Sequence, residues 1–214
     1  MDEKDTNIKP NIKLPTQEEC LSYFEKYKVP QNIKEHCLKV QEVAVFLAKE
    51  LNKVGFNLNV ELVSKTAVLH DLFKVVALDD LSPNKHHSYE HSEEEIAMWK
   101  HLRTKYPGMH ETDVLYLIFK DDYPDFALNL KNHGNPFVEN KLIEENLVHY
   151  CDWCVFKDKI VILSSRIDYC KEVYPQDEKF WSKDIIHMKE FEDKVLSKLS
   201  FKPEELNTLK TTFH

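Results

Sequence analysis

The sequence predicts a single all-α domain, and three observations lead to this prediction. Apolar residues recur with helical spacing in one segment after another, and the 214 residues are close to the length of one domain. Glycine is scarce: only 3 occur, which is too few for the many tight turns of a β-sandwich or β-barrel. They are widely separated, at Gly55, Gly108 and Gly134. This separation excludes the clustered glycines of a P-loop, a GxGxxG dinucleotide-binding turn and a GxSxG nucleophile elbow.

The N-terminal part is expected to begin with a flexible, solvated tail over residues 1–15. A short helix follows, to about Lys28, and Thr16 with Glu19 forms a capping box at its start. Pro30 then begins a long helix to about Val54, because apolar residues spaced alternately four and three apart form one stripe. The members of this stripe are Ile33, Cys37, Val40, Ala44, Leu47 and Leu51.

The next predicted helix, over residues 60–76, is apolar on two faces, so we expect it in the middle of the domain. Residues 79–90 are interpreted as a loop. Ser92 with Glu95 forms a second capping box. It opens a helix that ends before Pro107. The remaining expected elements are a helix over 111–121, an irregular connection over 122–136, a helical stretch over 139–173 interrupted near Lys157, a helix over 181–199 and a short terminal helix.

Composition and charge limit the classes of function. Hydrophobic residues make up 42% and charged residues 31%, a balance typical of soluble globular proteins. A net charge of −8 gives no general attraction for nucleic acid or anionic lipid, so we expect neither partner. The longest apolar runs, 43–48 and 114–119, are far shorter than the roughly 20 residues that span a bilayer. The polar N-terminus lacks the apolar region of a signal peptide. Five cysteines, an odd number without a disulfide framework, indicate a cytoplasmic location.

The most informative dipeptide is His70-Asp71, at the end of the most hydrophobic predicted helix. A buried carboxylate is costly unless it is paired or bound to a metal. His36 and Asp152 also lie on apolar faces of predicted helices. Imidazole and carboxylate together suit zinc, manganese, iron, cobalt or nickel rather than calcium. Taken alone, His36 also fits a hydrogen-bonded histidine at the edge of the core, and Asp152 fits a residue paired with Lys or Arg.

The order His36, His70-Asp71, Asp152 resembles the HD-domain superfamily of metal-dependent phosphohydrolases. Three surrounding segments are similar to the helices that carry these residues in the family, and together they fall within about residues 30–175. They are NIKEHCLKVQEVAVFLAKEL, ELVSKTAVLHDLFK and LVHYCDWCVFKDKIVILSSRIDYCKEVYP.

The resemblance implies an HD-like metal-binding helical bundle over residues 16–176, with extra C-terminal helices over 177–214 packed on the same domain. It implies that His36, His70, Asp71 and Asp152 hold a divalent ion (Mn, Fe, Co, Ni, Zn or Mg), with one or two ions per chain. Members with two metals add two histidines between the HD pair and the last aspartate. By position these would be His91 and His133, in competition with His86, His87 and His110. The chain departs from some members at Lys120-Asp121-Asp122, where they place a histidine.

Lys74 follows the HD pair at i+4 from His70 and i+3 from Asp71, so on a helix it would share their face. We expect its ammonium group to bind a phosphate oxygen of the substrate, which gives Lys74 a catalytic role beside Asp71. The alternative is a lysine that extends into solvent.

Two further features have structural interpretations. Arg166 would lie about 21 Å beyond Asp152 on a straight helix, so it is assigned to a structural salt bridge. The CxxC spacing of Cys151 and Cys154 lacks the second pair of a zinc site and the βαβ setting of a redox motif. These cysteines are therefore expected to pack around Asp152.

The first functional hypothesis is a phosphohydrolase that hydrolyses a phosphate monoester or diester by a metal-activated water. Its expected partner is a small phosphorylated substrate, with nucleotides as the leading class. Two alternatives stay open. One is a di-iron oxygenase of the HD type, which would need both His91 and His133, and the other is a non-catalytic nucleotide-binding HD module. A homodimer is the default expectation for an assembly of this chain.

Overall fold

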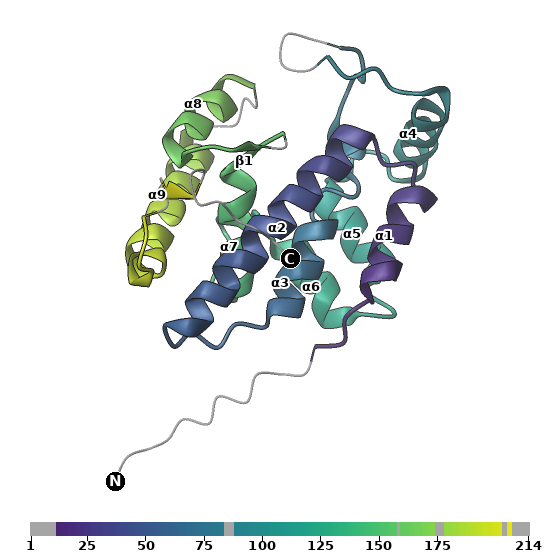
Figure 1. Cartoon of the computed structure of the whole chain (residues 1–214). Helices are drawn as coiled ribbons and strands as arrows, with labels where there is room; N and C mark the ends of the chain where they lie inside the picture. The colour runs from purple at the N-terminus through teal and green to yellow at the C-terminus, as the bar shows by residue number, and fades with distance from the viewer. Residues whose placement is uncertain (1–11, 84–87, 158, 174–177, 203–204, 207–214) are drawn as a thin grey trace.

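Helices form nearly all the regular structure of this chain (Figure 1). The computed structural model describes residues 12–83, 88–157, 159–173, 178–202 and 205–206. Its helices are α1 (Gln17–Lys26), α2 (Gln31–Lys53), α3 (Val60–Leu69), η1 (Lys74–Ala77), α4 (Glu93–Lys105), α5 (Glu111–Phe119), α6 (Pro124–Asn132), α7 (Ile143–Trp153), α8 (Leu163–Val173), α9 (Glu178–Lys194) and η2 (Leu196–Lys198). A small antiparallel hairpin joins β1 (Val155–Phe156) to β2 (Lys159–Ile160). The prediction of an all-α fold is confirmed.

The long helix α2 runs through the middle of the molecule, with α1, α4, α5 and α6 on one side and α7, β1, α8 and α9 on the other (Figure 1). Two apolar clusters lie on these two sides. One joins α2 and α3 to the C-terminal helices and includes Leu47, Val63, Val148, Met188 and Phe191. The other joins α2 and α3 to α1, α5 and α6 and includes Phe24, Cys37, Leu69, Leu115 and Phe126. Helices α2 and α3 therefore contribute to both clusters.

The predicted stripe of α2 is confirmed, because all six of its apolar residues are buried. The helix ends at Lys53, and Gly55 follows with φ of +100°, a conformation that L side chains rarely adopt. Both predicted capping boxes are also present. They form at Thr16 with Glu19 and at Ser92 with Glu95.

The predicted helix over 60–76 is wrong in its second half. Every residue from Leu62 to Leu69 is buried, as expected for a helix in the middle of the domain, but α3 ends at Leu69. His70 Nδ1 donates a hydrogen bond to the Ala67 carbonyl oxygen at 2.7 Å, a group that in a continuing helix accepts the N–H of residue 71. Tighter turns follow, and the chain resumes as the 3₁₀ helix η1 at Lys74. The end of α3 therefore coincides with the HD dipeptide.

Two other segments differ from the prediction. Residues 122–136 were expected to be irregular, yet they contain α6, with Pro124 in its first turn, where a proline is tolerated. Phe126, Ala127 and Leu130 of α6 are buried, so burial of one face stabilises this short helix. The predicted stretch 139–173 is interrupted near Lys157, as expected. The interruption is the β1–β2 hairpin, in which Lys157 has φ of +60°.

The ends of the chain are only partly described. Of the expected tail over 1–15, residues 1–11 lie outside the described part, while Ile12 and Leu14 pack against the second apolar cluster. The pair His86–His87 and most of the expected terminal helix also lie outside it. In the C-terminal region, α9 packs on α7 through Trp181, Met188 and Phe191. Within the described residues, none of the helices is long and apolar enough to cross a membrane.

Candidate metal centre

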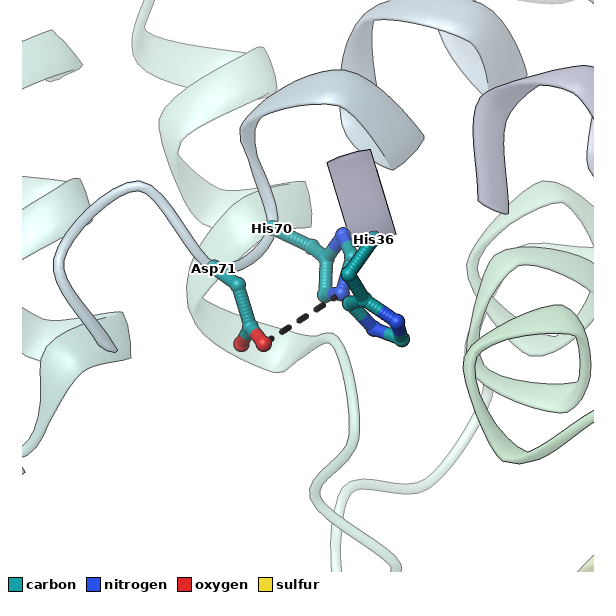
Figure 2. Close-up of side chains that lie close together, drawn as sticks. All are labelled: His36, His70 and Asp71. Atoms are coloured by element: carbon teal, nitrogen blue, oxygen red, sulfur yellow. Dashed lines mark ion pairs between the residues drawn. The ribbon is translucent and has the colours of Figure 1, made fainter. Parts of the chain in front are cut away.

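The structure brings together four of the predicted ligands. His36 comes from α2, His70 and Asp71 from the end of α3, and Asp152 from α7. His36 Nε2 lies 2.9 Å from Asp152 Oδ1, and His70 Nε2 lies 3.6 Å from the same oxygen and 3.7 Å from Asp71 Oδ2. Figure 2 shows the Asp71 carboxylate and the two imidazoles around one space. One ligand atom from each of His36, His70 and Asp71 lies within 4.8 Å of the others.

Backbone carbonyl groups orient both imidazoles. His70 Nδ1 is held by the Ala67 carbonyl oxygen, and His36 Nδ1 lies 3.3 Å from the carbonyl oxygen of Lys157. Because a carbonyl oxygen only accepts, each Nδ1 donates its proton and each Nε2 points toward the carboxylates. Metal-binding histidines commonly donate their second ring N–H to a carbonyl or carboxylate in this way. The hairpin after α7 therefore positions His36.

The donor set fits a divalent metal. His70 is 2% exposed, and its Nε2 has no hydrogen-bond partner within the described residues. A buried polar atom without a partner is costly, and an ion between the two imidazoles and the two carboxylates would supply that partner. Two nitrogen and two oxygen donors suit zinc, manganese, iron, cobalt or nickel.

The charges of these groups are strongly coupled. Burial lowers the pKa of His70, but the carboxylates of Asp71 and Asp152 outweigh it and raise the pKa to about 9. Burial favours the neutral form of Asp152, yet the hydrogen bond with His36 and the nearby His70 imidazole hold the pKa of this carboxyl well below its ordinary value. Burial acts likewise on Asp71, and Lys74 with His70 lowers its pKa. Both carboxylates are therefore ionised at neutral pH, as metal ligands must be.

Lys74 lies beside the site, although it is not on the helix that was expected to carry it. Its Nζ lies 3.4 Å from Asp71 Oδ1 and 3.4 Å from Glu111 Oε1. Glu111, in the first turn of α5, is buried at 6% exposure. The sequence reasoning missed Glu111, because nothing in its local pattern separates it from an ordinary acidic residue at a helix start. The lysine is thus held between two carboxylates at the edge of the site.

His133, predicted as a ligand of a second metal, ends α6 and lies beside His70, with ring centroids 5.3 Å apart. Burial, together with the charges of His70 and His149, holds the pKa of His133 well below its ordinary value. His149 was not singled out from the sequence. It lies on α7, three residues before Asp152, and its ring is 5.5 Å from that of His133.

The sequence offered three further candidates, whose contacts are with residues near them in the chain. His91 contacts Tyr89 and Glu95 of its own segment, and His110 caps α5. Arg166 contacts the rings of Phe156 and Tyr169, and the hairpin breaks the straight helix on which its predicted distance from Asp152 depended.

Cys151 and Cys154, on either side of Asp152, are buried free thiols. Burial raises the pKa of both thiols, that of Cys154 to about 12, so neither is a reactive thiolate at neutral pH. This environment agrees with the packing role expected from the sequence.

Comparison with known proteins identifies the family to which this arrangement belongs. The family model described as HD domain matches residues 33–155, more than half of the chain, and this range includes all four residues of the site. No match was found among curated proteins or among solved structures. Since the match covers the helices that carry His36, His70-Asp71 and Asp152, the chain belongs to the HD-domain family.

Proposed function

We propose that this protein is a metal-dependent phosphohydrolase that hydrolyses a phosphate monoester or diester of a small molecule, with nucleotides as the proposed substrate class. Proteins with an HD domain are in general metal-dependent phosphohydrolases. The observation that carries the proposal is the buried Nε2 of His70, which faces two carboxylates and has no hydrogen-bond partner within the described residues.

His36, His70, Asp71 and Asp152 would hold the metal. When bound, a divalent ion polarises a phosphate oxygen and lowers the pKa of a coordinated water toward neutrality. The Asp71 carboxylate lies 3.4 Å from Lys74 Nζ, and it would accept a proton from a water molecule at the site. The Lys74 ammonium group would bind a phosphate oxygen and stabilise the charge that develops on it.

Glu111 supports this role of Lys74. Of the two carboxylates that contact Lys74, Asp71 would also be a metal ligand. The second contact, to Glu111 Oε1 at 3.4 Å, keeps the ammonium group at the edge of the site when Asp71 binds the ion. Preorganised charges of this kind cost little reorganisation during the reaction.

Phosphate release from a panel of nucleoside monophosphates, cyclic nucleotides and a generic aryl phosphate tests the proposal. The metal-loaded protein should turn over at least one of these substrates, and Asp71→Ala should abolish both turnover and metal retention. Asp168→Ala on α8 removes an exposed carboxylate away from the site and should leave both unchanged. Nucleotide binding without turnover under every metal would instead support the non-catalytic module.

The di-iron oxygenase has less support. It would require both His91 and His133 as additional ligands. The ring of His133 lies beside that of His70. His91 contacts Tyr89 and Glu95 of its own segment. Oxygen uptake that depends on substrate would favour the oxygenase over the hydrolase.

A further inference from the structure

A buried hydrogen bond between a histidine and an aspartate joins α7 to α9 close to the proposed metal centre. His149 Nε2 lies 2.8 Å from Asp184 Oδ1, and the two side chains are 5% and 2% exposed. Burial of the Asp184 carboxylate costs free energy, and the hydrogen bond with His149 offsets part of this cost. The match to the HD family ends at residue 155, whereas Asp184 belongs to the C-terminal helix beyond it.

The pair fixes the orientation of the His149 ring. An ionised carboxylate only accepts hydrogen bonds, so Nε2 carries the proton that it shares with Asp184. The opposite nitrogen, Nδ1, faces the backbone of Gly134: a Cβ on this glycine would lie 3.4 Å from Nδ1. Gly134 has φ of +71° and directly follows His133. The ring of His149 therefore packs against the turn that carries His133.

The ring of His133 is held between two other imidazoles. Its centroid lies 5.5 Å from that of His149, with the rings nearly perpendicular at 89°, and 5.3 Å from that of His70. His133 is 7% exposed, and its Nε2 has no hydrogen-bond partner within the described residues. A continuous line of contacts thus runs from Asp184 through His149 and His133 to the HD dipeptide.

We propose that Asp184 and His149 are positioning residues of the metal centre. Asp184 fixes the ring of His149, and this ring holds His133 beside His70. By this contact α9, which lies outside the matched HD region, becomes part of the functional site. The inference rests on the proposed metal centre. A pair that only joins two helices would contribute to stability without affecting the ion.

Titration of the metal-free, full-length protein with Co²⁺ separates a positioning role from a purely stabilising one, because the visible absorption bands of bound Co²⁺ report the geometry around the ion. Asp184→Ala removes the acceptor and should weaken Co²⁺ binding about tenfold, the lower end of the effect of residues that support metal ligands. It should also shift the absorption bands. Asp184→Asn keeps an oxygen acceptor for Nε2 and should restore most of the affinity. The matched control is Asn146→Ala. It removes the 2.8 Å contact between Asn146 and His187, which joins the same two helices one turn away.

The proposal is overturned if Asp184→Ala and Asn146→Ala both lower the unfolding midpoint while both variants keep the Co²⁺ affinity and the absorption spectrum of the wild type. If Asp184→Ala does not fold, His149→Gln carries the test, since its amide can still donate to Asp184 while the ring against His133 is lost. It should give the same loss of affinity and the same spectral change. A wild-type protein that binds no Co²⁺ refutes the metal centre itself, a result distinct from a loss confined to the variants.

Discussion

Replacement of Asp152 by alanine tests whether the four-residue site is both an ion-pair cluster and a metal centre. In the metal-free protein the variant loses the 2.9 Å contact with His36, and it removes one of the two carboxylates that lie close to the buried Nε2 of His70. A hydrogen bond to a charged group contributes about 1.5–3 kcal/mol. Asp152 is 27% exposed, so the lower part of this range applies, and we expect the free energy of unfolding to fall by about 2 kcal/mol.

The effect of metal on the same variant is the sharper part of the test. Metal at a hundredfold excess over its Kd should stabilise the wild type by about 2.7 kcal/mol. If loss of one ligand weakens binding a hundredfold, the same metal concentration stabilises Asp152→Ala by only about 0.4 kcal/mol. Urea unfolding with and without Zn²⁺ or Co²⁺ measures both quantities, and Asp168→Ala serves as the control. A variant that gains as much stability from the metal as the wild type would refute the assignment of Asp152 as a ligand.

Three further predictions concern the surroundings of the site. Glu111→Gln weakens the contact that positions Lys74 but leaves the ammonium group itself, so it should lower kcat/KM about tenfold, less than the loss of a preorganised donor, with metal content unchanged. The matched change Asp113→Asn, on the same helix, should have no effect, and equal activity of both variants would contradict the role of the glutamate. Gly134→Ala and Gly108→Ala, at φ of +71° and +68°, should each lose about 1–2 kcal/mol in urea unfolding. Only Gly134→Ala should also weaken Co²⁺ binding. An equal change of Co²⁺ affinity in both variants would contradict the proposed link between the turn at Gly134 and the metal centre. Because the fold raises the pKa of His70 from 6.5 to about 9, its contribution to the metal-free protein is fully present below about pH 6.5. This contribution to the free energy of unfolding is lost as the pH rises through 9. Urea unfolding at several pH values measures it, and a His70→Gln variant whose free energy of unfolding has the same pH dependence as the wild type would contradict the assignment.

Helical periodicity allowed the prediction of the main supports of the site. The spacing of apolar residues along α2 placed His36 at the edge of a buried face, and the two-faced pattern of α3 placed His70 and Asp71 in the interior. These predictions succeeded because burial of one face is an average over many residues and depends little on any single contact. The ligand set itself came from the family resemblance, because spacing within one helix does not show which other helix faces it.

Residues that complete the site through contacts between distant elements could not be predicted. Glu111 meets a lysine 37 positions earlier, and Asp184 meets His149 35 positions earlier. Neither pair has a local pattern, since both depend on how helices pack against one another. The break at the HD dipeptide was missed for a related reason. The side chain of His70 donates a hydrogen bond to the carbonyl oxygen of Ala67 in its own helix, and hydrophobic periodicity does not reveal such a bond.

The most direct test of the metal centre is the metal content per chain, measured by elemental analysis of protein purified anaerobically without a metal-affinity tag. We expect about one divalent ion per wild-type chain if the four-residue site alone is occupied. We expect little or none in Asp71→Ala and Asp152→Ala. Failure to find or load any divalent ion in the wild type, or full occupancy in both variants, would contradict it.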